Sequence, residues 1–384
     1  MRSTMRRIVS SLAFLPLVGC TGAAVDLDVK APGDGQAIIN GDVCDEATEP
    51  TAVAIMIDAT VNFGQGQPFD IVQASCTGTL IAPDVVLLAA HCLDLSLLTF
   101  GFGTVERSEF YVTFEADLSR FAEADPQGTP LPIPESAIPA KGSVVHPNFD
   151  IQSLGEGTAG VESDVAVLFL EVPIETVLPE VVITAAEGDQ IADGAAVTIA
   201  GWGQQVATSG PFDPPPAGSV GIKVCGSTTV EEVGQSMIQV GDAPESTRKC
   251  HGDSGGPTYM EVETSSSIKR RVIGVTSRAY DQSDCAKGGV DTRVDFFVDW
   301  LDGEMKKACA DDTRVWCDVD GVLSADDVVA LGEGDGEGEG EGEGLGDPVT
   351  LDSCGSCASS GVGVVPTALL GLIALLRRRR AGRQ

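Results

Sequence analysis

The sequence is poor in histidine and in basic residues. Its three histidines are too few to complete zinc sites with its eleven cysteines, so disulfides formed outside the cytoplasm are the better interpretation of the cysteines. Lysine and arginine number 24 against 57 aspartates and glutamates, which gives a formal net charge of -33. This charge argues against nucleic acid and anionic membrane surfaces as partners, and its simplest role is solubility in water.

Long helical patterns are also missing between Ile38 and about Asp302. Short apolar stretches such as "VVLLAAHC", "DVAVLFL" and "AAVTIAGWG" alternate there with glycine, proline and aspartate clusters. Their length and spacing predict an all-β barrel or sandwich. Only "DFFVDWLDGEMKKACA", from about Asp295, has apolar residues at helical spacing.

The N-terminal segment predicts export. Residues 1–20 have a basic start, an apolar run and small residues, which is typical of a bacterial secretory signal peptide. The end of this segment, Leu17 to Cys20, resembles the lipobox of bacterial lipoproteins, in which the cysteine is lipidated. Ordinary signal cleavage a few residues later is the alternative. Residues 21–37 are small and polar and predict a flexible propeptide.

The C-terminal part predicts a spacer followed by a sorting signal. Residues 303–353 include "LGEGDGEGEGEGEGLGDP", which cannot bury anything and predicts an acidic, extended linker. Residues 354–384 combine small residues, a short apolar run and four arginines. This tail resembles the C-terminal sorting tails of myxobacteria, which a membrane protease trims. A simple tail anchor, or a disulfide between Cys354 and Cys357, is the alternative.

Both ends together predict a protein exported by a Gram-negative bacterium, either held at the cell surface or secreted. Membrane contact is expected only through the terminal segments, and a C-terminal sorting protease is an expected partner.

A short acidic stretch before the linker raises the question of a metal. "CDVDGVLSADD" resembles part of a calcium loop, with Asp318, Asp320, Gly321 and Asp327 in suitable places. Trp316 stands where the first carboxylate should be, so we expect neither a metal nor another cofactor. A disulfide between Cys309 and Cys317 is the alternative use of this stretch.

Three separated residues have the properties needed to hydrolyse an amide by acyl transfer. "GDSGGP" places Ser254 on a glycine turn, where the N–H groups of Gly252 and Ser254 can converge on an oxyanion. His91 ends an apolar strand and is the candidate base. Asp164, among the apolar residues of "ESDVAVLFL", is the candidate carboxylate that orients it.

The two other histidines are weaker candidates for the base. His146, in "VVHPNFD", is expected in a turn. His251, beside the glycine turn, is expected at the cleft entrance.

The chain resembles a trypsin-like serine protease from Ile38 to about Asp302. The resemblance rests on "IINGD", "CTGTL", "LLAAHC", "DVAVLFL", "AGWG" and "CHGDSGGP", which occur in the family's order. It implies two antiparallel six-stranded β-barrels with the triad between them, a C-terminal helix, and endopeptidase activity on proteins or peptides. A surface binding protein built on an inactive protease scaffold is the alternative, but all three triad residues are present.

The resemblance also implies disulfide partners and an activation step. Gln239 stands where the family has a cysteine of a further disulfide, so the loop around Gln239 should be less constrained. Cleavage before Ile38 would free an amino group to pair with Asp253. Because Ala37 precedes that bond, an activating protease that prefers small residues is implied. The implied disulfides are Cys44–Cys225, Cys76–Cys92 and Cys250–Cys285.

The expected substrate pocket carries a cation. Counting back from Ser254, the family pattern places Arg248 at the pocket base, with Ser277, Arg278 and Gly289 on its walls. Arg248 could pair with Asp291, which would leave a shallow pocket for small or apolar residues. It could instead bind a substrate carboxylate with the help of Arg278. In the third alternative, Arg248 and Lys249 point to solvent. We do not expect cleavage after lysine or arginine, because that would bury a second cation against Arg248.

Overall fold

The computed structural model describes residues 38–333, except residues 65–66, 100, 123–129, 156–158, 207–215, 217, 282–284 and 286. The predicted signal peptide, the lipobox at Cys20, the propeptide and the sorting tail with Cys354 and Cys357 lie outside the described residues, as does most of the acidic linker. Within the described residues, none of the helices has the length and apolar character needed to cross a membrane.

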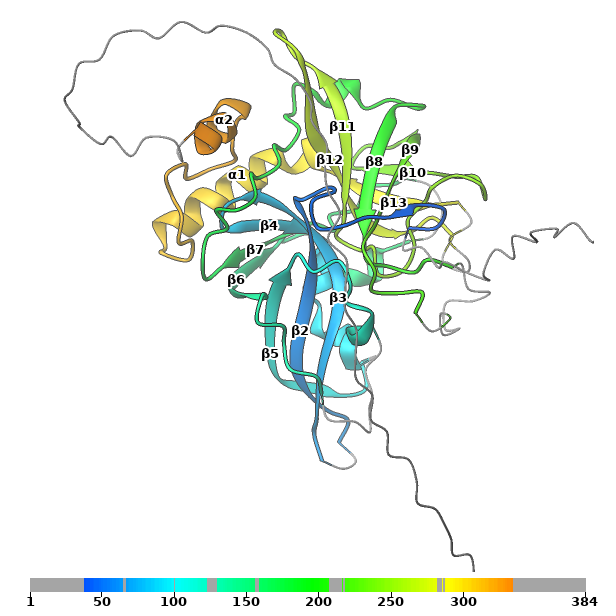
Figure 1. The fold of residues 1–384 in the computed structure, drawn as a ribbon, viewed down its shortest axis with the longest axis vertical. Helices are drawn as coiled ribbons and strands as arrows, with labels where there is room; N and C mark the ends of the chain where they lie inside the picture. The colour runs from blue at the N-terminus through cyan, green and yellow to red at the C-terminus, as the bar shows by residue number, and fades with distance from the viewer. Residues whose placement is uncertain are drawn as a thin grey trace, which may run out of the picture. The chain divides into compact units, whose positions relative to one another are not determined.

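The first part of the described chain forms a closed, six-stranded antiparallel barrel (Figure 1). Its strands follow one another in the order β2-β3-β4-β7-β6-β5. Apolar side chains such as Ile55, Leu80 and Leu168 fill its core, which is why these segments read as short apolar runs. The strands are β2 Ala52–Asn62, β3 Phe69–Ala82, β4 Val85–Leu88, β5 Thr104–Thr113, β6 Ile138–Val145 and β7 Ala166–Leu170.

The second part forms another antiparallel barrel, with the order β9-β10-β13-β12-β11-β8 and a pairing of β8 with β9 that closes it. The short β1 lies outside on β9, where Asp42 pairs with Cys225. The two six-stranded barrels confirm the predicted fold. The strands are β1 Asp42–Val43, β8 Ala196–Gly201, β9 Val224–Val233, β10 Met237–Val240, β11 Pro257–Glu263, β12 Ile268–Ala279 and β13 Gly289–Arg293.

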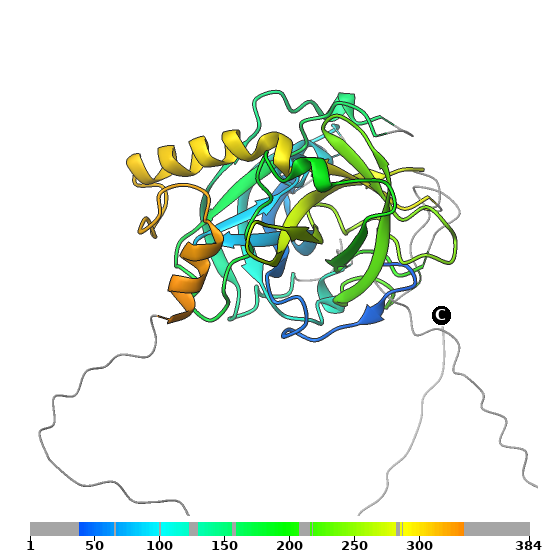
Figure 2. The ribbon, with the colours of Figure 1, turned by 90° about the horizontal axis from the view of Figure 1, so that it is seen from above.

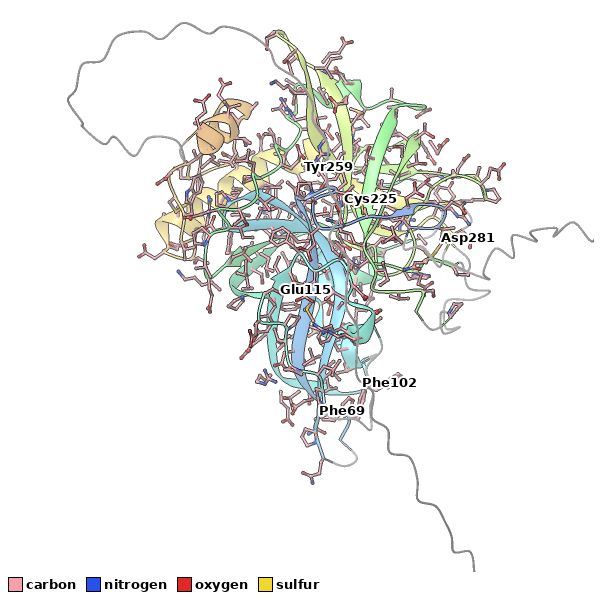
Figure 3. All side chains as sticks on the ribbon, in the orientation of Figure 1. Phe69, Phe102, Glu115, Cys225, Tyr259 and Asp281 are labelled. Atoms are coloured by element: carbon pink, nitrogen blue, oxygen red, sulfur yellow. A yellow bond between two sulfur atoms is a disulfide. The ribbon has the colours of Figure 1, made fainter. Side chains whose placement is uncertain are left out.

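Hydrogen bonds connect the two barrels near their boundary. The hydroxyls of Thr51, just before β2, and Tyr259, in β11, are 2.8 Å apart and buried. Figure 3 labels Tyr259 in the second barrel, and Phe69 and Phe102 at the end of the first barrel that points away from it. Short 3₁₀-helices connect the strands: η1 Ala90–Leu93, η2 Leu95–Thr99, η3 Ser119–Phe121, η4 Ile151–Ser153 and η5 Gly188–Gln190.

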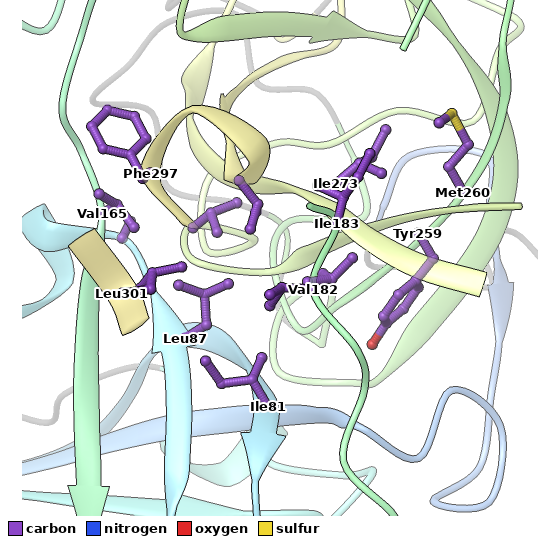
Figure 4. Packing of buried hydrophobic residues seen from close by; sticks show 14 of the residues in the cluster. Ile81, Leu87, Val165, Val182, Ile183, Tyr259, Met260, Ile273, Phe297 and Leu301 are labelled. Atoms are coloured by element: carbon purple, nitrogen blue, oxygen red, sulfur yellow. The ribbon is translucent and has the colours of Figure 1, made fainter. Parts of the chain in front are cut away.

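Helix α1, Val294–Ala310, begins one residue before the predicted start and joins the cores of the two barrels. Figure 4 shows Phe297 and Leu301 of α1 close to Leu87 and Val165 of the first barrel. The buried residues of α1 recur every three or four positions, as expected for a helix with one apolar face. They are Val294, Phe297, Leu301, Met305 and Ala308.

Four disulfides are present in the described residues. Three of them are the bridges that the family resemblance implies: Cys44–Cys225, Cys76–Cys92 and Cys250–Cys285. The fourth, Cys309–Cys317, is the alternative that the sequence offered to a calcium loop. Asp327, one of the candidate calcium ligands, accepts hydrogen bonds from the N–H and hydroxyl of Ser324 at the start of a helix.

The folded part of the chain continues beyond Asp302, which corrects the predicted start of the linker. Helix α1 runs to Ala310, and a further helix, α2, spans Ala325–Glu333. Both lie on the same side of the barrels (Figures 1 and 2). Val328 and Leu331 of α2 pack against the main hydrophobic core. Burial of apolar surface therefore holds this extension on the barrels.

A buried ion pair anchors the extension to the first barrel. Arg314 and Asp84 both have fully buried side chains, and Arg314 Nη2 is 2.9 Å from Asp84 Oδ1. The other oxygen, Asp84 Oδ2, accepts hydrogen bonds from the N–H groups of Val315 and Trp316. Asp84 lies in the turn between β3 and β4, so the C-terminal extension packs on that turn and supplies the hydrogen-bond partners of its carboxylate.

Removing the arginine should destabilise the whole fold. We expect Arg314→Ala to lower the free energy of unfolding by about 3–5 kcal/mol, because it leaves a buried carboxylate without its cation. Arg107→Ala is the matched control, since Arg107 also pairs with an aspartate, Asp58, but is 42% exposed. That change should cost less than about 1 kcal/mol. Equal losses in equilibrium urea unfolding would show that the buried pair is not an anchor.

Candidate active site

The ends of two neighbouring strands bring His91 and Asp164 together. Strands β4 and β7 pair in antiparallel fashion, with Leu88 opposite Ala166. His91 follows β4 and Asp164 precedes β7, so the two residues meet at the same edge of the sheet. His91 Nδ1 lies 2.7 Å from Asp164 Oδ2, and the His91 N–H donates to Asp164 Oδ1 at 2.9 Å.

Asp164 is buried, and hydrogen bonds fix its position. Its side chain is fully buried, and the Ser277 hydroxyl donates to Oδ2 at 2.6 Å. The Thr292 hydroxyl donates to the Asp164 carbonyl oxygen at 2.9 Å. These two hydroxyls come from the second barrel, so both barrels fix the position of this carboxylate. The sequence placed Ser277 on the pocket wall but did not reveal this hydrogen bond.

Ser254 lies on a tight turn that only glycine permits. Gly252 and Gly255 have φ values of 94° and 80°, and a Cβ on Gly255 would lie 2.2 Å from the carbonyl oxygen of Thr77. The Thr77 N–H donates to the Ser254 carbonyl oxygen at 2.8 Å, which docks the turn on β3. In the described residues, the N–H groups of Gly252 and Ser254 have no acceptor, whereas those of Asp253, Gly255 and Gly256 have one.

Asp253 is a buried carboxylate in a space left by two glycines. A Cβ on Gly201 or Gly203 would lie within 3 Å of its side chain, which explains the glycines of the "GWG" motif. Its oxygens accept hydrogen bonds from the N–H groups of Gly203 and Cys250, both at 2.9 Å. Burial raises the pKa of Asp253 from its ordinary value to about 7.

Ile38 lies buried in the uncut chain. Its side chain belongs to the main core, and its φ of 54° is a left-handed conformation that isoleucine seldom adopts. The next residue, Ile39, pairs with Arg248, whose N–H donates to the Ile39 carbonyl oxygen at 3.0 Å.

His91 and Ser254 line one cavity, of about 200 Å³. The structure records no hydrogen bond between the Ser254 hydroxyl and the His91 ring in the part of the chain that it describes, and such bonds often tighten only when substrate binds. Ser277, Arg278 and His251 also line this cavity. The full lining is His91, Lys249, Cys250, His251, Ser254, Thr276, Ser277, Arg278 and Ala279.

Arg248, predicted at the base of the pocket, does not line this cavity. Its Nε donates to the carbonyl oxygen of Cys285 at 2.9 Å, and its Nη1 donates to that of Pro244 at 2.6 Å. The predicted pair with Asp291 is not formed, because Asp291 pairs with Lys249 instead. Adjacent side chains on extended backbone point to opposite sides, so Lys249 lines the cavity while the buried Arg248 lies on the other side of the backbone.

Lys249 is fully enclosed, and so are its partners. Its side chain is 1% exposed, and its Nζ donates to Asp291 Oδ2 at 2.7 Å and to the Thr258 hydroxyl at 2.6 Å. A Cβ on Gly289 would lie 3.1 Å from the Lys249 Cβ, so Gly289 is a neighbour of the lysine and not of the cavity. Burial lowers the pKa of Lys249, although the Asp291 carboxylate opposes this shift. Asp291 Oδ1 has no hydrogen-bond partner among the described residues.

Arg278 pairs with a residue that the sequence gave no reason to choose. Its Nη2 lies 3.0 Å from Glu162 Oε1, and both side chains are buried. Glu162 is itself placed by Ser236, whose hydroxyl accepts a hydrogen bond from the Glu162 N–H at 3.0 Å. Its position shortly before Asp164 in the sequence was the only available signal.

His146 lies away from this site, in agreement with its prediction as a turn residue. Its ring packs edge-on against Phe297 and Trp300 of α1, and burial lowers its pKa. Two clusters of cysteine and histidine occur among the described residues, but their cysteines are disulfide-bonded and offer no thiolate to a metal. The clusters are Cys76, His91 and Cys92, and Cys250, His251 and Cys285.

Comparison with known proteins agrees with this geometry. The profile of the Trypsin family matches residues 38–301. The chain is 26% identical over 252 residues to trypsin from Phaedon cochleariae, a match that covers 60% of this chain and 79% of that protein. It is 28% identical over 237 residues to Proproteinase E from Bos taurus, which covers 59% of this chain and 82% of that protein. Since the family profile spans more than half of the chain, the protein belongs to the trypsin family and is a serine protease.

Proposed function

We propose that this serine endopeptidase works through an acyl-enzyme, with Ser254 as nucleophile, His91 as base and Asp164 as the carboxylate that orients the base. The observation that carries the proposal is the hydrogen-bonded pair of His91 and Asp164 on the same cavity as Ser254. The hydrogen bond to Asp164 favours the proton on His91 Nδ1, which leaves Nε2 with a free electron pair.

In the first half of the reaction, Ser254 Oγ attacks the carbonyl carbon of the scissile bond while His91 Nε2 takes its proton. The carbonyl oxygen becomes an oxyanion, and the N–H groups of Gly252 and Ser254 are available to donate to it. His91 then gives its proton to the leaving nitrogen. The C–N bond breaks, the first product departs, and the other half of the substrate stays as an ester on Ser254.

In the second half, water takes the place of the leaving amine. His91 removes a proton from the water as its oxygen attacks the ester carbon. When the new tetrahedral intermediate collapses, the proton returns to Ser254 Oγ and the acid product is released. Asp164 stabilises the imidazolium in both halves, and the Ser277 hydroxyl keeps this carboxylate in place.

Activation requires cleavage before Ile38. The carboxylate of Asp253 is fully buried, and its partners are backbone N–H groups, so no cation pairs with it among the described residues. A new amino group on Ile38 would supply that cation next to the turn that carries Gly252 and Ser254. An activating protease that accepts alanine is therefore a partner. The name Proproteinase E describes one similar protein as a precursor, which fits a zymogen.

The location follows from the termini and the disulfides. Residues 1–20 direct export, and residues 354–384 are removed by a sorting protease or anchor the protein in the envelope of a Gram-negative bacterium. The four disulfides of the described residues support an oxidising compartment.

Removal of the nucleophile tests the triad. We expect Ser254→Ala to lower kcat by at least about 10⁴-fold while circular dichroism and the disulfides stay unchanged, since the hydroxyl acts in chemistry and not in packing. Peptide hydrolysis by the cleaved protein, measured before and after the change, gives the ratio. Activity within tenfold of wild type would show that Ser254 is not the nucleophile.

A controllable cut tests activation. Gly33→Asp, Gly35→Asp, Gln36→Asp and Ala37→Lys together create an enteropeptidase site around Asp34 and keep Ile38 as the new terminus. A fluorophosphonate should label Ser254 only after the cut. Asp253→Asn in the same background should be cut equally well but labelled at least about 10²-fold more slowly, because the oxyanion turn loses its ion pair. Absence of label in the cut parent protein would favour a binding protein on an inactive scaffold.

The pH dependence of stability tests the unpaired carboxylate. The folded, uncut chain holds the pKa of Asp253 at about 7, above its ordinary value of 3.8, so the unfolded chain releases this proton first. Stability of the uncut chain therefore falls as pH rises from about 4 to about 7. With Ser254→Ala present to prevent digestion, the cut chain should gain roughly 2 kcal/mol over the uncut chain between pH 5 and pH 7.5. A constant difference would contradict the proposed ion pair.

A further inference from the structure

The cavity beside Ser254 presents basic residues, and no acidic residue, among those that line it in the described chain. Lys249 and Arg278 belong to the lining. A free cation in such a cavity would favour a substrate with a carboxylate, whereas a neutralised one would not. The partners of the two side chains therefore decide which substrates fit.

Lys249 directs its charge away from the cavity. Its ammonium group donates to Asp291 and Thr258, which are fully buried and do not line the cavity. The Lys249 Cβ and Cδ pack against Gly289. The cavity wall at this point is therefore formed by the methylene stem of a lysine whose charge is already matched by a carboxylate behind it.

Arg278 is neutralised in the same way. Its guanidinium donates to both carboxylate oxygens of Glu162, from Nε at 3.2 Å and from Nη2 at 3.0 Å. Glu162 does not line the cavity either. A substrate carboxylate would have to displace Glu162, which holds the Arg278 guanidinium by two hydrogen bonds. A substrate cation would lie near Lys249 and Arg278, and the described wall offers no free carboxylate to pair with it.

The cavity of the uncut chain is small, which favours small side chains. Its volume is about 200 Å³, and this volume includes the space between His91 and Ser254 where the scissile carbonyl must lie. Pockets that enclose a drug-sized ligand have about 300–1,000 Å³. The part left for the side chain before the scissile bond is correspondingly small.

We propose that this protease cleaves after small, uncharged side chains such as alanine, serine, threonine and valine, and that the buried pair of Lys249 and Asp291 forms the floor that selects them. The inference rests on the proposed function, since it assumes that Ser254 attacks the bond next to this cavity. The Ala37–Ile38 bond belongs to the same class of substrate.

The test uses the full chain after the engineered cut before Ile38. Peptides that differ only in the residue before the scissile bond carry alanine, valine, phenylalanine, glutamate or lysine there, and a further peptide copies the sequence around Ala37. We expect kcat/KM for alanine or valine to exceed that for glutamate and lysine by at least about 100-fold. The highest value for glutamate, lysine or phenylalanine would overturn the proposal.

Two variants test the floor itself. Asp291→Asn leaves Lys249 without its anion, so the glutamate-to-alanine ratio of kcat/KM should rise by at least about tenfold. The double variant Lys249→Met with Asp291→Asn removes both charges and should keep the parent ranking. Because each ratio is taken within one sample, partial unfolding lowers both values equally and leaves the ratio informative. An unchanged ratio in Asp291→Asn would show that this pair does not select the substrate.

Fluorophosphonate labelling distinguishes a failure of the proposed substrate preference from a failure of the proposed function. If Ser254 is labelled stoichiometrically and the ranking of peptides is different, only the proposed preference fails. If the cut chain is neither labelled nor active on any peptide, the proposed function fails first.

Discussion

An ionised side chain is costly to remove from water unless an opposite charge goes with it. This constraint organises the interior of the protein. Arg314 is buried with Asp84, Lys249 with Asp291, and Arg278 with Glu162. Each pair joins segments that are distant in the sequence, so each also fixes the relative position of two parts of the fold. The extension and two basic residues that line the cavity each depend on such a pair.

Asp253 departs from this pattern, and its departure has a functional meaning. Backbone N–H groups stabilise its carboxylate, but in the described residues no cation pairs with it. The raised pKa of Asp253 expresses the resulting cost. This residue separates Gly252 from Ser254, so in the described residues a buried carboxylate without a cation lies in the turn that carries the proposed nucleophile. The proposed cut before Ile38 would thereby be coupled to the geometry of the site.

The sequence predicts those parts of the site that short motifs determine. The barrels, the pairing of His91 with Asp164 and the glycine turn of Ser254 depend on local patterns and on an order that a whole family shares. Arg248, which was expected in the pocket, does not line the cavity, whereas its neighbour Lys249 does. The sequence could not decide between two adjacent cations, because only the course of the backbone sets which of them contacts the cavity. Glu162 and Asp84 could not be matched to their arginines, because nothing in a single sequence links residues so far apart.

The bond between Arg314 and Asp84 has a consequence for the order of events during synthesis. The strands of the first barrel are complete by Leu170, yet the cation that neutralises the buried Asp84 is made 230 positions after that aspartate. Until then, the turn between β3 and β4 carries a carboxylate that has to stay in contact with water. A nascent chain can therefore bury this turn only after the extension has been made.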